Sequence, residues 1–160
     1  MIYTLNNTPV SSQIVNEDYL PLKVVYDDTV NCNYIGFYNN DNLLEICTDK
    51  ATGNIKRLVV INCKTFEFSD DSLAVPDAVE EGTLAVHLAN RIECSNLSLT
   101  VFHDGVSIAL SEESPQHYCR CGNVYYGFDQ DGENLLNVIV AQMTEAEIGH
   151  IKDELLIEAE

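Results

Sequence analysis

Three residues in one short stretch of the chain have side chains that bind metal ions. His117, Cys119 and Cys121 lie in the sequence HYCRCG, and imidazole and thiolate groups are common zinc ligands. Structural zinc sites usually use Cys-x2–4-Cys spacing and four ligands, whereas the spacing here is Cys-x-Cys and no second paired cluster follows. Burial of both thiols on one face of a strand would also explain this spacing. We therefore expect no metal and no other cofactor.

A second candidate is the acidic stretch DQDGEN, which begins at Asp129 and could be a calcium loop. With Asp129 at position one of a twelve-residue loop, Asp131 and Glu133 fall at positions three and five. The glycine required at position six is instead Asn134, and the closing carboxylate at position twelve is instead Val140. The flanking residues also resemble strands rather than helices. This stretch is therefore predicted to be a hairpin turn.

Nucleophilic catalysis requires a thiol or hydroxyl beside an oriented base. The chain has four histidines and six cysteines, so such pairs arise by accident, as at His117 and Cys119. No Gly-x-Ser-x-Gly elbow, phosphate-binding loop or His-Glu-x-x-His motif accompanies them. The cysteines are scattered, mostly in apolar runs, which predicts small buried side chains rather than disulfides. We expect no catalytic residues and a protein that is not an enzyme.

Charge is the strongest signal in the sequence. Of 160 residues, 26 are acidic and 8 are basic, and the net charge is −18. Residues 1–64 hold seven acids and five bases, whereas residues 65–160 hold nineteen acids and three bases. Such a surface repels nucleic acid and anionic membranes and attracts basic partners, although it could also serve solubility or salt adaptation alone. We expect ten residues to bind a partner: Asp70, Asp71, Asp77, Glu80, Glu81, Glu112, Glu113, Asp129, Asp131 and Glu133.

The length and composition predict one domain, residues 1–160. A chain of this size with 46% hydrophobic residues can bury a sizeable core. No apolar run is long enough to span a membrane, and the N-terminus MIYTLNNTPV lacks the basic and apolar regions of a secretory signal. These features favour a cytoplasmic protein.

Short runs rich in Val, Ile, Tyr and Phe recur between turn residues, which is typical of strands. Hairpins are predicted across DKATGN (49–54), HDG (103–105) and DQDGEN (129–134). At the C-terminal end, Thr144 and Glu147 form a capping box, and Ile148, Ile151, Leu155 and Leu156 follow at helical spacing. The predicted fold class is α+β and β-rich, with mostly antiparallel sheets built from hairpins and a C-terminal amphipathic helix.

Two segments of the chain, 34–46 and 125–138, also match each other. The matched pairs are Tyr34 with Tyr125, Gly36 with Gly127, Phe37 with Phe128, Asn42 with Asn134, Leu43 with Leu135, Leu44 with Leu136 and Ile46 with Val138. The offset grows by one residue at the turn, so the later turn is longer. Two related hairpins would explain the matches, and so would the general composition of hairpins.

Two stretches of the chain resemble segments that are common in one family of small bacterial proteins. The segment LLEICTDKATGNIKRLVVINC (43–63) has an apolar Leu-Glu-Ile strand, Asp-x-x-Thr-Gly, then Ile-Lys-Arg and a second apolar strand. The segment 123–155 looks like the closing unit of these proteins: a Gly-Phe-Asp strand, a turn, an apolar strand and a helix opened by Thr and Glu. That family is similar to the immunity proteins, which neutralise the toxin domains of polymorphic-toxin or contact-dependent growth-inhibition systems. The resemblance implies a non-enzymatic inhibitor that binds a cognate toxin domain in the bacterial cytoplasm.

The charge independently indicates a basic partner, and many such toxin domains are nucleases with basic clefts. Direct nucleic-acid binding is not expected, because only Lys56 and Arg57 place two bases side by side. Two alternatives stay open at this point. The protein could mimic nucleic acid and inhibit a DNA-binding protein, or it could be a metal-dependent enzyme that uses His117, Cys119 and Cys121.

Overall fold

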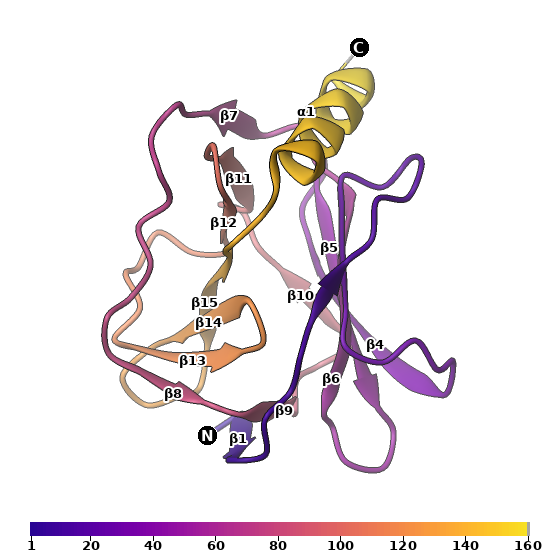
Figure 1. Cartoon of the computed structure of the whole chain (residues 1–160). Coiled ribbons are helices and arrows are strands. Elements are labelled where there is room, and N and C mark those ends of the chain that lie inside the picture. Colours follow the sequence, from indigo (N-terminus) through magenta and orange to yellow (C-terminus); the bar gives the residue numbers. More distant parts are fainter. Residues whose placement is uncertain (160) are drawn as a thin grey trace.

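Runs of alternating apolar residues form two β-sheets that face each other across the main core (Figure 1). The structure is a computed structural model and describes residues 1–159, without the side chain of Glu158. The first sheet has six strands in the order β10 (Arg91–Glu93), β4 (Cys32–Tyr38), β5 (Leu43–Asp49), β6 (Ile55–Asn62), β3 (Leu22–Val25) and β2 (Gln13–Ile14). The second sheet has seven strands in the order β7 (Phe66–Phe68), β11 (Ser98–Val101), β12 (Val106–Ala109), β15 (Leu135–Val140), β14 (Val124–Phe128), β13 (His117–Cys121) and β8 (Val79–Glu81). A third, two-stranded sheet pairs β1 (Tyr3–Asn6) with β9 (Thr83–Val86), and α1 (Glu145–Glu158) follows β15.

Side chains that point inward from the two large sheets fill the core. Phe37 of the first sheet and Tyr126 and Phe128 of the second are almost fully buried. A polar contact also crosses between the sheets: the Tyr26 hydroxyl donates to the carbonyl oxygen of Cys121 at 2.7 Å and lies 3.2 Å from the Tyr126 hydroxyl. Burial therefore joins the sheets, and the hydroxyls in the core are satisfied.

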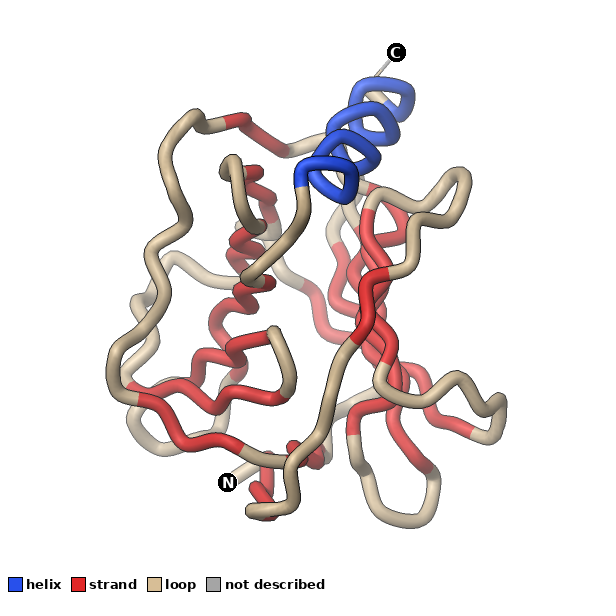
Figure 2. The backbone as a smooth tube through the Cα atoms, in the orientation of Figure 1, coloured by secondary structure: helices blue, strands red, loops and turns tan. Residues whose placement is uncertain are grey.

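The predicted hairpins and the antiparallel, β-rich fold class are confirmed. Strands occur throughout the chain (Figure 2), and α1 is the one helix among the described residues. Three parallel pairs were not predicted: β10 with β4, β7 with β11, and β8 with β13. Each of these edge strands has only three residues, which is too short for a recognisable alternation of apolar and polar side chains.

The two matching segments form hairpins of the same register, one in each large sheet. Gly36 lies opposite Glu45 in the first hairpin, and Gly127 lies opposite Asn137 in the second. A register shift between Gly127 and Phe128 accommodates the extra residue of the later turn. The two hairpins are therefore structural counterparts, β4–β5 and β14–β15.

One segment, residues 69–78, runs from one edge of the second sheet to the other, and we call it the strap. It leaves β7 at one edge, passes over the outer face and enters β8 at the opposite edge (Figures 1 and 2). Leu73 packs against Tyr125 and Ile139 on that face, and its N–H donates to Asp104 Oδ1 at 2.8 Å. The strap therefore covers the outer face while its flanking strands close both edges.

The C-terminal helix begins as predicted. Thr144 accepts a hydrogen bond from the Glu147 N–H, and the Glu147 carboxylate accepts one from the Thr144 N–H. Ile148, Ile151 and Leu155 are buried, but the prediction was wrong for Leu156, which is 51% exposed. One residue turns a helix by about 100°, so Leu156 lies beyond the buried stripe. Among the described residues, no helix is both long and apolar enough to cross a membrane.

Candidate functional site

The structure brings six of the ten predicted acidic residues to one end of the second sheet. The loop 110–116 leaves β12 and enters β13 at this end, and the turn 129–134 joins β14 to β15 there, since His117 lies opposite Phe128. β8 runs parallel to β13 and enters the sheet beside Tyr118, so the residues just before β8 lie at the same end. We call these six residues the acidic end: Asp77, Glu112, Glu113, Asp129, Asp131 and Glu133.

The other four predicted residues lie elsewhere. Asp70 and Asp71 follow β7, which ends beside Val101 at the opposite end of the sheet. Glu80 and Glu81 are neighbours in the edge strand β8, so their side chains point to opposite faces. The ten carboxylates therefore do not form one continuous surface.

Asp129 organises the turn at the acidic end. Its Oδ1 accepts hydrogen bonds from the N–H groups of Glu133 at 2.8 Å and Asn134 at 3.2 Å, and its Oδ2 accepts one from the Asn134 side chain at 2.8 Å. The Asn134 side chain, followed by these N–H groups, lowers the pKa of the Asp129 carboxyl below its usual value. The predicted hairpin turn is confirmed, and the Asp129 carboxylate stabilises this turn.

The remaining carboxylates of the acidic end are exposed and poorly neutralised. Glu133 lies 2.8 Å from the amino group of Met1, and no other residue of the acidic end forms an ion pair within the described part of the chain. Lysine and arginine side chains are absent from the loop 110–116 and the turn 129–134. The acidic end is therefore a site of uncompensated negative charge.

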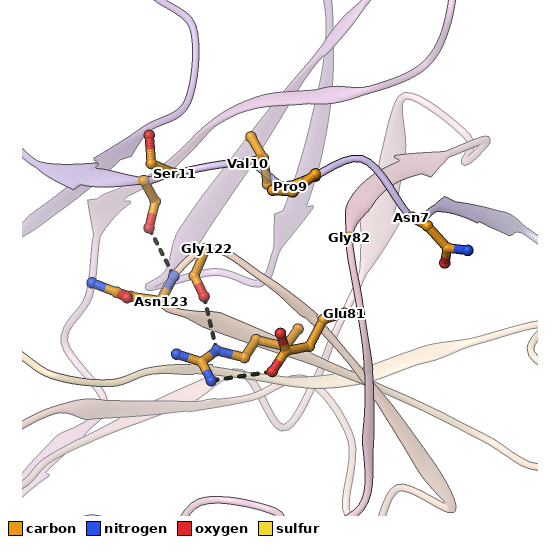
Figure 3. A pocket seen from close by; sticks show the side chains of 10 residues that line it. Asn7, Pro9, Val10, Ser11, Glu81, Gly82, Gly122 and Asn123 are labelled. Atoms are coloured by element: carbon orange, nitrogen blue, oxygen red, sulfur yellow. Dashed lines mark hydrogen bonds and ion pairs between the residues drawn. The ribbon is translucent and has the colours of Figure 1, made fainter.

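The few basic residues in 65–160 are engaged away from this end. Arg120 Nη1 lies 3.3 Å from Glu81 Oε1, and its Nε donates to the Gly122 carbonyl oxygen at 3.0 Å. Figure 3 shows these bonds at the rim of a hollow of about 360 Å³ beside the β13–β14 turn. Arg91 and Lys152 each lie over an aromatic ring. None of these cations neutralises the acidic end.

The candidate metal ligands His117, Cys119 and Cys121 all contact other parts of the fold. His117 Nε2 lies 2.8 Å from the Asp129 carbonyl oxygen, and its Nδ1 lies 3.3 Å from the Tyr3 hydroxyl. Both thiols point into the core, and burial raises the pKa of Cys119 to about 11. Within residues 1–159, no three His, Cys, Asp or Glu side chains are placed to hold a metal ion. All six cysteines are buried and none forms a disulfide, as predicted.

A second hollow, of about 590 Å³, was not predicted. It lies on the outer face of the β4–β5 hairpin, where Tyr34, Gly36 and Tyr38 point outward from β4 and Glu45 points outward from β5. The pattern Tyr-x-Gly-x-Tyr was visible in the sequence, but it could not show that this face is uncovered. Arg91 is also part of its lining.

Comparison with protein-family models and with curated proteins gives no match for this chain.

Proposed function

We propose that this protein is an immunity-type inhibitor, which binds a cognate basic toxin domain in the cytoplasm and blocks its substrate cleft. The observation that carries the proposal is the acidic end, where exposed carboxylates are gathered with almost no neutralising cation. Such a field accelerates association with a basic surface and fixes its orientation. A nuclease domain, whose cleft must hold phosphates, is a partner of this charge.

The proposal assigns no chemistry to the protein itself. A cysteine nucleophile or metal ligand reacts as the thiolate. Burial raises the pKa of Cys119 to about 11, so its thiol is protonated at neutral pH. His117 is held by Tyr3 and by the Asp129 carbonyl on its two ring nitrogens. These contacts favour a binding protein over the metal-dependent enzyme.

Where the gene immediately upstream encodes a large secreted protein with a small variable C-terminal domain, that domain is the candidate toxin for the test. Co-expression of this protein should rescue growth, and the purified proteins should bind. The association rate should fall by about tenfold or more between ~0.05 M and ~0.5 M NaCl, because salt screens the attraction. No rescue and no binding would refute the immunity function, and a rate unaffected by salt would refute the electrostatic mechanism.

Charge reversal locates the surface. Glu112→Lys with Glu113→Lys should slow association severalfold, because it places cations in the acidic end. Asp70→Lys with Asp71→Lys is the matched control, since it makes the same charge change at the opposite end of the sheet. Equal effects of the two pairs would mean that net charge alone guides binding. A nucleic-acid mimic would behave differently: the protein would compete with DNA for many DNA-binding proteins, and neither pair of substitutions would weaken its binding.

A further inference from the structure

The two counterpart hairpins differ in what covers their outer faces. In β14–β15, the outer face beside Gly127 is closely covered. A Cβ atom on Gly127 would lie 2.7 Å from Pro115 Cγ and 2.8 Å from Tyr118 Cε1. Glycine is therefore required there, because any side chain would clash with the residues that pack onto the strand.

Residues on the same outer face as Gly127 also contact side chains of the neighbouring strand β13. Arg120 Cζ lies 5.4 Å from the centre of the Tyr125 ring. The Asn137 side chain, opposite Gly127, donates a hydrogen bond to the Tyr118 hydroxyl at 3.1 Å. In this hairpin, the tyrosine, the glycine and the residue opposite it each have a partner.

The equivalent residues of β4–β5 have no such cover. The nearest atoms to a Cβ on Gly36 would be Leu43 Cδ1 at 3.5 Å and the Asn90 carbonyl oxygen at 3.8 Å, which are ordinary contacts. Gly36 also has no positive φ, so neither packing nor backbone requires glycine at a position where it weakens a strand. Tyr34, the counterpart of Tyr125, is 50% exposed.

The residue opposite Gly36 is a carboxylate that lacks a cation. Glu45 is half-buried, and among the described residues its side chain accepts one weak hydrogen bond, from the Cys47 thiol at 3.7 Å. No lysine or arginine pairs with it among the described residues. Two cations line the hollow, Lys64 and Arg91, and Arg91 Cζ already lies 4.5 Å from the centre of the Tyr38 ring. A partly desolvated carboxylate without a counter-ion favours a charged donor.

We infer that this hollow receives an arginine side chain of the basic partner, whose guanidinium stacks on Tyr34 above Gly36 and donates hydrogen bonds to Glu45. The inference rests on the proposed function and adds a second, specific contact to it. The covered hairpin supplies the precedent, because Arg120 occupies the same place over Tyr125. A planar guanidinium can stack and bind a carboxylate together, which a lysine ammonium does less well.

The test is an NMR titration of the whole ¹⁵N-labelled protein with N-acetyl-arginine amide, with N-acetyl-lysine amide as the comparison. The backbone amides of Tyr34, Gly36 and Glu45 should shift and saturate with a Kd of about 1–10 mM, as expected for one stacked, charge-paired side chain. Gly36→Leu should abolish the shifts by filling the hollow, and Glu45→Gln should weaken binding about tenfold. Glu67→Gln is the control, because it removes the same charge in an edge strand of the other large sheet, at a residue that does not line the hollow.

The inference would be overturned if no amide shifted at ~100 mM arginine amide, a concentration far above the expected Kd. It would also be overturned if the lysine amide bound equally well, or if Gly36→Leu left binding of the arginine amide unchanged. A tetralysine peptide, added separately, reports on the acidic end through the amides of Glu112, Glu113 and Asp131. If tetralysine binds there and the hollow does not respond to arginine, the inference fails while the proposed function stands. If only the hollow responds, the electrostatic basis of the proposed function fails instead.

Discussion

The carboxylate of Asp129 accepts the hydrogen bonds that hold a turn, and we expect it to stabilise the fold only while it is ionised. Hydrogen bonds from Asn134 and from nearby N–H groups lower its pKa in the folded state. A group with a lowered folded pKa stabilises the fold above its unfolded pKa, and this contribution is lost as the pH falls through the folded value. Asp129→Asn should therefore reduce stability at pH ~7, and the difference from the wild type should shrink as the pH falls below ~4 and vanish below the lowered folded pKa.

Urea unfolding of both proteins across this pH range measures the effect. Asp131→Asn makes the same charge change in the same turn, at an exposed side chain that receives no hydrogen bond from the described residues. It should leave stability nearly unchanged at every pH. A pH-independent loss in Asp129→Asn would show that the side chain acts through shape rather than charge.

At the scale of elements, Gly149 weakens a helix without an evident packing reason. Apart from its chain neighbours and the backbone of its own helix, no atom of the described residues lies within 4 Å of a Cβ placed on it. Gly149→Ala should raise the free energy of unfolding by about 1 kcal/mol, the usual difference between the two residues inside a helix. Urea denaturation measures the change.

Gly53→Ala is the opposite control for that experiment. Gly53 has a φ of 79°, and a Cβ there would lie 2.7 Å from His87 Cε1, so alanine should destabilise the protein. If Gly149→Ala also destabilises, the helix surface is more constrained than its open surroundings indicate.

Elements with strong local signals were predictable from the sequence. The capping box at Thr144 and the hairpin across residues 103–105 rest on contacts between residues close in the chain, and both are confirmed. Leu156 was misassigned because helical spacing gives the direction of a side chain but not the width of the buried face. The parallel strands β7, β8 and β10 depend on partners distant in sequence, which a three-residue pattern cannot specify.

The candidate site was predictable only in part. Charge composition identified the acidic region, but it could not separate Asp70 and Asp71 from Glu112 and Glu113, because the sheet topology sets which loops meet. The hollow beside Gly36 had no sequence signal of its own, since its counterpart Gly127 has the same local pattern under a closed cover.

For the whole molecule, net charge should limit stability. The charge of −18 is opposed by only four ion pairs among the described residues, so mutual repulsion of carboxylates outweighs attraction. Raising NaCl from ~0.05 M to ~0.5 M should therefore increase the urea midpoint, because the Debye length becomes shorter. The rise should be smaller at pH ~4, where many carboxylates bind protons. A midpoint that falls with salt would contradict this view.

The strap has a further consequence for how this protein would self-associate when damaged. Both outer strands of the second sheet, β7 and β8, adjoin this one segment, which Leu73 helps to hold against the face. Losing a single edge strand would leave one open edge, so two such molecules could pair through it and form a closed dimer that does not grow further. A cut or detachment within the strap would free both edges together, so each molecule could accept a neighbour on either side. The expected product is then an open-ended polymer rather than a dimer.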